Sequence, residues 1–267
     1  MISVILLGAG NVATHLYKAF SNSENISITQ WYNRTRASIS SYANEVDITD
    51  SLDELKEADI YIMAISDDSI EQFSTDLPFT NRFVIHTSGS VAMHDIDKKN
   101  KIGVFYPLQT FSKDAEIDFT EVPICIEVYE KENLQLLKDL AKAVGCKPHK
   151  ITTEQRQTLH LAAVFVNNFT NQLYRIGHEI CETKNIEFEI LHPLIEETAK
   201  KIQQMSPFMA QTGPAKRNDK KTIKRQLKLI EKEEHESIYK LLTTSIKKTH
   251  NVSNFRPRKG KAETNLK

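Results

Sequence analysis

The start of the chain constrains the fold more than any other segment. Residues 2–7 (ISVILL) form a short, apolar and largely β-branched run, which is typical of a parallel strand buried on both faces. Gly8-Ala9-Gly10 ends this run, and apolar residues then recur at helical spacing through residues 11–20. A strand, a glycine turn and a helix in this order predict the opening of a dinucleotide-binding domain.

The glycine turn matches a known pattern: GAGNVA, residues 8–13, fits G-x-G-x-x-G/A. We expect Gly8 to turn the chain tightly, Gly10 to leave room for a pyrophosphate, and Ala13 to let the helix lie close to the sheet. The backbone N–H groups of Asn11 and Val12, at the helix start, would then face the phosphates. A plain tight turn into a helix is the alternative, and the position after the first strand of a series makes it the weaker one.

The end of the second predicted strand favours one cofactor. NAD-binding chains usually carry Asp or Glu there, and that carboxylate would repel a 2′-phosphate. This chain has Asn33-Arg34-Thr35 instead. A guanidinium can hold a phosphate in a fork while Asn and Thr donate to its oxygens. The sequence therefore favours NADP over NAD, unless Arg34 simply faces solvent.

Strands and helices alternate through the first half of the chain. Besides residues 2–7, strand signals lie near residues 26–32, 46–48, 59–65, 82–86, 103–106, 123–128 and 148–152. This alternation predicts an α/β fold, with a doubly wound parallel-sheet Rossmann domain that binds NADP over residues 1–152.

The second half has a different character. Residues 153–253 contain only long helical periods, at residues 158–181, 188–205 and 220–248, and predict an all-helical domain for substrate binding and dimerisation. Residues 254–267 are polar, basic and poor in apolar side chains, so we expect a disordered tail.

Composition excludes several classes of partner. Lys plus Arg and Asp plus Glu each total 35, so no net charge attracts nucleic acid or an acidic membrane surface. No apolar run approaches the roughly 20 residues that cross a bilayer, and no leader follows Met1, so we expect a cytoplasmic protein with a small-molecule substrate. The three cysteines are widely spaced, and no metal site is predicted.

Several motifs resemble a known superfamily. GAGNVA, YNRT, AISDDSI, HTSGS and GVFYPLQTFS are similar to segments of pyrroline-carboxylate reductases, ketopantoate reductases and β-hydroxyacid dehydrogenases. The chain more closely resembles a bacterial group of Rossmann-like oxidoreductases with an uncharacterised helical C-terminal domain, through HLAAVFVNNF (residues 160–169) and TGPAKRND (residues 212–219). The resemblance implies a nicotinamide cofactor across the strand ends, an active site in an interdomain cleft, and a homodimer assembled through the helical domain.

The same resemblance assigns residues at the strand ends. It implies that Ile65 and Ser66 flank the ribose, and that Ser88 and Gln109 approach the nicotinamide or the substrate. Each of these residues could instead be an ordinary cap or turn residue.

The apolar segment HLAAVFVNNF carries the main catalytic candidates. Burying His160, Asn167 and Asn168 costs about 1 to 3 kcal/mol each unless they are partnered. On a regular helix His160 and Asn168 share one face, whereas Asn167 is rotated by about 100°. Reduction of a carbonyl by hydride leaves an alkoxide, and His160 is suited to protonate it, although a purely structural histidine is equally compatible with the sequence.

One departure from the resemblance limits the mechanism. β-Hydroxyacid dehydrogenases place a lysine four residues before the asparagine of this helix, where this chain has Ala163 or Val164. Their proton-transfer mechanism therefore cannot be carried over to this chain.

The last unusual segment is TGPAKRND. We expect Gly213-Pro214 to open a helix with Lys216 and Arg217 near its start, where the helix dipole disfavours cations unless an anion offsets them. A substrate carboxylate or a cofactor phosphate would supply that anion, and a solvated basic turn is the alternative.

Two functions follow from these observations. The first is an NADP-dependent reductase of a small 2-oxo acid, imine or similar carbonyl, with ketopantoate suggested by resemblance only. The second is a sensor or structural module that holds NADP without turnover, which the missing lysine slightly favours.

Overall fold

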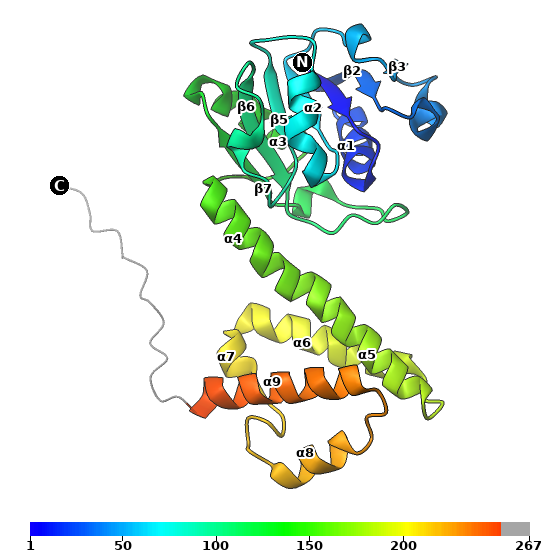
Figure 1. The fold of residues 1–267 in the computed structure, drawn as a ribbon, viewed down its shortest axis with the longest axis vertical. Helices are drawn as coiled ribbons and strands as arrows, with labels where there is room; N and C mark the ends of the chain where they lie inside the picture. The colour runs from blue at the N-terminus through cyan, green and yellow to red at the C-terminus, as the bar shows by residue number, and fades with distance from the viewer. Residues whose placement is uncertain (252–267) are drawn as a thin grey trace, which may run out of the picture. The chain divides into compact units, whose positions relative to one another are not determined.

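The computed structural model describes residues 1–251 of the 267-residue chain. The disordered tail predicted for residues 254–267 lies outside the described residues. The chain divides into two compact units, the first ending at Phe169 and the second beginning at Thr170 (Figure 1).

The first unit is built on one eight-stranded sheet, with strand order β3-β2-β1-β4-β5-β6-β7-β8. Its strands are β1 (Ile2–Leu7), β2 (Ile26–Tyr32), β3 (Ile48–Thr49), β4 (Ile60–Met63), β5 (Phe83–His86), β6 (Lys101–Pro107), β7 (Ile124–Val128) and β8 (Pro148–Lys150). Neighbouring strands are parallel except β6 and β7, so the last two strands run opposite to the first six. The 3-2-1-4-5-6 order confirms the predicted Rossmann fold.

Alternate residues of β1 explain why the sheet is covered on both faces. Val4 and Leu6 pack in one apolar cluster with side chains of α1 (Asn11–Ser21) and α3 (Leu134–Ala143). Ile5 and Leu7 pack in a second cluster with Ile70 of α2 (Ile70–Asp76). Because successive side chains of a strand point to opposite faces, a continuous apolar strand requires a helix layer on each side.

Short 3₁₀ turns connect many of these elements. They are η1 (Arg36–Tyr42), η2 (Leu52–Glu54), η3 (Asp67–Ser69), η4 (Met93–Asp95), η5 (Phe119–Glu121) and η6 (Lys131–Asn133).

The first unit extends beyond the last strand into a helical segment. Helix α4 (Thr153–Ala163) is followed by the π-helix η7 (Val164–Phe169), after which the second unit begins with α5 (Thr170–Glu182). The strand and helix alternation ends near residue 152, as the sequence indicated, but α4 belongs to the compact first unit because its side chains contact the ends of β5 and β6.

The described part of the second unit is helical, as predicted. After α5 come η8 (Phe188–Leu191), α6 (His192–Gln204), α7 (Pro207–Ala210), α8 (Lys220–Leu227) and α9 (Glu233–Asn251). No helix among the described residues is long and apolar enough to cross a membrane.

The single helix predicted over residues 220–248 is wrong, because α8 ends at Leu227 and α9 begins at Glu233. Beside this break, Lys232 Nζ lies 2.7 Å and His235 Nε2 lies 3.3 Å from Glu179 Oε2 on α5. Such tertiary contacts override the local helical pattern.

Candidate functional site

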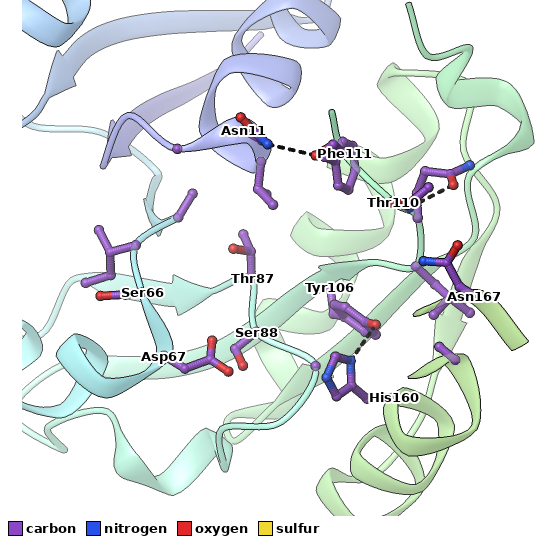
Figure 2. A pocket seen from close by; sticks show the side chains of 18 of the residues that line it. Asn11, Ser66, Asp67, Thr87, Ser88, Tyr106, Thr110, Phe111, His160 and Asn167 are labelled. Atoms are coloured by element: carbon purple, nitrogen blue, oxygen red, sulfur yellow. Dashed lines mark hydrogen bonds between the residues drawn. The ribbon is translucent and has the colours of Figure 1, made fainter. Parts of the chain in front are cut away.

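A cleft of about 1210 Å³ opens at the carboxyl ends of β1, β4, β5 and β6, and all the residues that line it belong to the first unit (Figure 2). Most of the predicted site residues line this cleft: Gly8, Gly10, Asn11, Val12, Asn33, Ile65, Ser66, Ser88, Gln109, His160 and Asn168. Ligands of such sheets bind beyond the carboxyl ends of the strands, and the volume exceeds the roughly 300–1,000 Å³ of ordinary small-ligand pockets.

The glycine end of the cleft comprises Gly8, Gly10 and the start of α1. Gly8 has a φ of +112°, and a Cβ atom there would lie 2.4 Å from the carbonyl oxygen of Ala64, so only glycine fits. A Cβ atom at Gly10 would meet nothing within 4 Å. Helix α1 begins at Asn11 without a side-chain cap or an acidic residue in its first turn. Its first backbone N–H groups therefore suit an anion such as a diphosphate.

A tryptophan that the motif does not include supports this turn. Trp31 Nε1 donates a hydrogen bond to the carbonyl oxygen of Gly8 at 2.7 Å, and its buried ring is stacked on Tyr17 with centroids 4.6 Å apart. Strand β2, which carries Trp31, thus supports the glycine turn through this hydrogen bond.

The loop after β6 is tied to the start of α1. Asn11 Nδ2 donates to the carbonyl oxygen of Phe111 at 2.8 Å (Figure 2), and His15 Nε2 donates to that of Ser112 at 2.8 Å. Gln109 Oε1 accepts from the backbone N–H of Thr110 at 2.8 Å. These contacts hold Gln109 and Thr110 in the wall of the cleft.

The predicted 2′-phosphate residues follow β2. Asn33 lines the cleft and donates from Nδ2 to the carbonyl oxygen of Thr35 at 2.9 Å, which shapes the turn. Arg34 and Thr35 are exposed and are not among the lining residues, whereas Ser38 is, although the sequence did not suggest it.

Ser88 shapes the loop after β5. Its Oγ accepts from the backbone N–H groups of Ser90 at 3.1 Å and Val91 at 3.0 Å. Its own N–H donates to His86 Nδ1 at 3.1 Å. Ser88 is therefore a turn residue, one of its two sequence interpretations, and it also lines the cleft.

The histidine end of the cleft comprises Gly89, Tyr106 and His160. Tyr106 Oη and His160 Nδ1 are 3.1 Å apart, and Figure 2 shows the two side chains pointing toward each other. A Cβ atom at Gly89 would lie 2.5 Å from His160 Nδ1, so the glycine leaves the space that the imidazole occupies. Burial raises the pKa of Tyr106 to about 12. Its hydroxyl therefore keeps its proton, and Oη and Nδ1 share one hydrogen bond.

The buried cation Arg156 supports the histidine end of the cleft. Arg156 is 0% exposed, and its Nη1 donates to the carbonyl oxygen of Ser88 at 2.9 Å. Its Nη2 lies 3.4 Å from Glu127 Oε2. One residue along α4, Gln157 Nε2 donates to the carbonyl oxygen of Ser90 at 2.8 Å. Two neighbouring residues of helix α4 thus form hydrogen bonds to the loop after β5, one at Ser88 and one at Ser90.

The same cation acts on a buried histidine. Burial, followed by the nearby charge of Arg156, lowers the pKa of His86 to about 3. The imidazole is therefore neutral, which agrees with its Nδ1 accepting from Ser88. Sequence reasoning missed Tyr106 and Arg156, because each acts through a partner far away in the chain.

The asparagines are positioned by the π-helix. Asn167 and Asn168 both line the cleft, although a regular helix would turn them about 100° apart and leave only one facing it. The wider turn of a π-helix changes the helical phase and is frequent at functional sites.

Comparisons with known proteins identify the family. A candidate NADP oxidoreductase from Bacteroides fragilis is 36% identical, with 92% of this chain and 98% of that chain covered and a TM-score of 0.84. The chain belongs to the family of that protein. The family described as "Domain of unknown function (DUF2520)" matches residues 122–246, and no curated protein matches the sequence.

More distant structures share the fold of this family. A pyrroline-5-carboxylate reductase from Streptococcus pyogenes is 14% identical, with 94% of this chain and 97% of that chain covered and a TM-score of 0.62. An imine reductase variant from Myxococcus stipitatus is also 14% identical, with 95% of each chain covered and a TM-score of 0.60. At this identity the likeness concerns the fold, and it bears out the expected resemblance to pyrroline-carboxylate reductases at that level.

The predicted substrate residues Lys216 and Arg217 lie in the second unit, within the segment that matches the family. The helix expected to open at Gly213-Pro214 is wrong. The segment forms a hydrogen-bonded turn, and α8 begins at Lys220 with Asp219 as its cap. Neither Lys216 nor Arg217 starts a helix, so no helix dipole calls for an anion beside them. Lys216 Nζ instead donates to the carbonyl oxygen of Gln211 at 2.8 Å.

Across residues 1–251, no three His, Cys, Asp or Glu side chains are grouped so that they could hold a metal ion.

Proposed function

We propose that this protein is an NADP-dependent oxidoreductase that reduces a small carbonyl or imine. One observation carries the proposal: a single cleft contains both the anion-binding glycine end and a histidine with a defined hydrogen-bond partner. Membership in the family of the Bacteroides fragilis protein supports the same class of activity.

The glycine end fits a dinucleotide. Gly8 permits the tight turn, the open space at Gly10 admits a diphosphate, and the uncapped N–H groups of Asn11 and Val12 face it. Ile65, Ser66 and Gln109 would line the ribose and nicotinamide. When bound, the nicotinamide supplies a hydride to the substrate.

The histidine end would deliver the proton. Tyr106 occupies Nδ1, so Nε2 is the ring nitrogen left for the substrate. His160 donates a hydrogen bond to the substrate oxygen or nitrogen and, when protonated, transfers a proton to it. Asn168 orients the substrate, and Ser88 sets the shape of the loop on which the substrate rests.

The preference for NADP rests on the turn after β2. Arg34 is exposed beside Asn33, which lines the cleft, so its guanidinium can reach a 2′-phosphate without competition from a carboxylate at that strand end.

The second unit is proposed to form a homodimer. Its helices expose large apolar side chains, such as Leu173 at 41%, Leu194 at 63% and Leu241 at 70%. Large apolar side chains exposed in such numbers are typical of a surface that binds another protein chain. Sedimentation should show a dimer that Leu241→Asp weakens, and a monomer at every concentration would contradict this part of the proposal.

The deciding experiment measures NADPH oxidation with a panel of 2-oxo acids, including ketopantoate, and cyclic imines. We expect turnover of at least one compound and a fall of about 10²-fold in kcat for His160→Ala. His149→Ala is the matched control, because His149 is exposed on β8 and does not line the cleft. Unchanged activity in His160→Ala would remove this residue from the mechanism.

Binding measurements separate the alternatives. If calorimetry shows NADPH binding but no panel member is reduced, a sensor or structural module becomes the better description. If neither nicotinamide dinucleotide binds, both functions are excluded.

A further inference from the structure

The peptide group between Ser88 and Gly89 lies between a buried cation and the cleft. On one side, the Ser88 carbonyl oxygen accepts a hydrogen bond from Arg156 Nη1 at 2.9 Å. On the other, Gly89 lines the cleft. We infer that the backbone N–H of Gly89 binds a substrate oxygen, with Arg156 as the positioning residue that orients and polarises this peptide; the inference rests on the proposed function.

Peptide geometry gives the N–H its direction. The backbone is without cis peptide bonds among the described residues, and in a planar trans peptide the N–H points opposite to the preceding C=O. The Ser88 carbonyl points at Arg156, so the Gly89 N–H points away from it. Within residues 1–251 no group accepts a hydrogen bond from this N–H. Buried N–H groups without a partner are rare, so this donor is best explained as facing the cleft.

Charge strengthens the donor. Arg156 is fully buried, and its carboxylate partner Glu127, at 3.4 Å, also accepts from both the N–H and the hydroxyl of Thr153 at 2.8 Å. The guanidinium therefore acts on the Ser88 carbonyl in surroundings with little water. Hydrogen bonds that involve an ion polarise their neighbours, so a cation bound to the C=O makes the N–H of the same peptide a stronger donor.

The donor and the proposed proton source are neighbours in the wall of one cleft. Gly89 and His160 both line it, and a Cβ atom at Gly89 would be 2.5 Å from the imidazole, so one small substrate can contact the Gly89 N–H and the His160 side chain together. In the proposed reduction the reduced nicotinamide would supply the hydride, losing a C–H bond and becoming oxidised, while a C–H bond forms at the carbonyl carbon and the C=O π pair moves to oxygen. The Gly89 N–H stabilises that negative charge, and protonated His160 then transfers its proton to give the alcohol.

This arrangement specifies the substrate class. A carbonyl oxygen accepts hydrogen bonds throughout the reaction and gains negative charge. A protonated imine instead presents an N–H donor, which would face a second donor at Gly89. The site therefore favours a carbonyl compound over an imine.

The Gly89 amide can be observed alone. The chain has 8 glycines, and Ser88-Gly89 is the only place where serine precedes glycine. Protein made with ¹³C-carbonyl serine and ¹⁵N glycine therefore gives one carbonyl-to-amide NMR correlation. The full chain is saturated with NADP⁺ and titrated with oxamate, which resembles a 2-oxo acid, and separately with pyrrolidine, the product of a cyclic imine.

We expect oxamate to move the Gly89 proton signal downfield and pyrrolidine to leave it in place. A full shift on NADP⁺ alone would assign this amide to the cofactor and overturn the inference, as would no shift at any oxamate concentration or a shift with pyrrolidine only. In a plain ¹⁵N–¹H correlation of the same sample, which contains the glycine amides, the signals of Gly8 and Gly10 report separately on the proposed function. If they move with NADP⁺ while Gly89 is unaffected by oxamate, only the inference fails.

The role of Arg156 is tested by a charge-balanced pair of substitutions. Arg156→Met alone would leave Glu127 without its cation and could unfold the protein, so Arg156→Met is combined with Glu127→Gln. We expect this double variant to keep the NADP⁺-induced shifts of Gly8 and Gly10 but to lose most of the oxamate-induced shift of Gly89. Arg156→Lys, which keeps the charge, should retain part of it. An undiminished shift in the double variant would exclude the role of Arg156.

Discussion

The two ends of the cleft are built by different means. At the glycine end, backbone conformation and free N–H groups form the site, and the side chains serve mainly to support the turn from outside. At the histidine end, side chains from α4, β6 and the loop after β5 converge through contacts between residues far apart in the chain. A short motif therefore suffices to predict a site built from backbone groups, whereas a site made of converging side chains depends on the whole fold.

The largest effect should come from adding one methyl group at the glycine end. Gly8→Ala places a Cβ 2.4 Å from the carbonyl oxygen of Ala64 at a φ of +112°. We expect a loss of about 3 kcal/mol in the free energy of unfolding and loss of nucleotide binding. Urea unfolding and calorimetry with NADPH measure the two effects.

Gly10→Ala is the matched control, since a Cβ there meets nothing within 4 Å. Its free energy of unfolding should stay within about 0.5 kcal/mol of the original protein. Its affinity for NADPH should still fall roughly tenfold or more, because the new methyl group enters the cleft where the diphosphate would rest. Equal stabilities of the two variants would contradict a backbone-built glycine end.

The corresponding change at the histidine end should affect chemistry rather than nucleotide affinity. Gly89→Ala would put a Cβ 2.5 Å from His160 Nδ1 and displace the imidazole from Tyr106. We expect kcat to fall about 10²-fold while the Kd for NADPH changes little. Gly177→Ala is a suitable control, because a Cβ there would make an ordinary contact at 3.7 Å.

Acid should destabilise the histidine end through His86. Its pKa is about 3 in the folded protein against 6.5 for a free histidine, so the unfolded chain takes up the proton first as pH falls. The contribution is complete above pH 6.5, declines by about 1.4 kcal/mol per pH unit below it, and levels off near the folded pKa. Urea unfolding measured at several pH values should show that the free energy of unfolding depends less on pH in His86→Asn. An unchanged dependence on pH would mean that His86 is not held neutral.

The smallest effect concerns cofactor choice. Arg34→Ala should raise the Kd for NADPH about tenfold and leave that for NADH unchanged, because only NADPH carries the 2′-phosphate. Arg36→Ala, at the next arginine along the turn, should have a smaller effect. Equal losses for both dinucleotides in Arg34→Ala would argue against the proposed NADP preference.

The sequence predicted the elements that depend on local backbone chemistry. The turn at Gly8 and the apolar strands of the sheet follow from glycine conformation and from the period of buried residues, and both are confirmed. The reversed direction of β7 was not predicted, because an apolar run carries no information on whether its neighbour is parallel.

The histidine end was predicted only in part. His160 and Asn168 stand out as polar residues in an apolar segment, and both line the cleft. Tyr106 lies 54 positions from His160 and shows no local signal. Arg156 would be expected at the surface, and its burial depends on the loop and strand that it contacts. Nor does the sequence mark the π-helix that brings Asn167 to the same cleft.

The hydrogen bond between Trp31 and the glycine turn allows ligand binding to be followed by the protein's own fluorescence. The chain contains one tryptophan, Trp31, whose indole nitrogen is bonded to the turn at 2.7 Å. Indole fluorescence responds to changes in such a bond and in the surrounding field. The chain also has 8 tyrosines, so the excitation light must be one that tyrosine does not absorb. Emission then comes from a single indole next to the turn, and its intensity and wavelength report the binding of a dinucleotide.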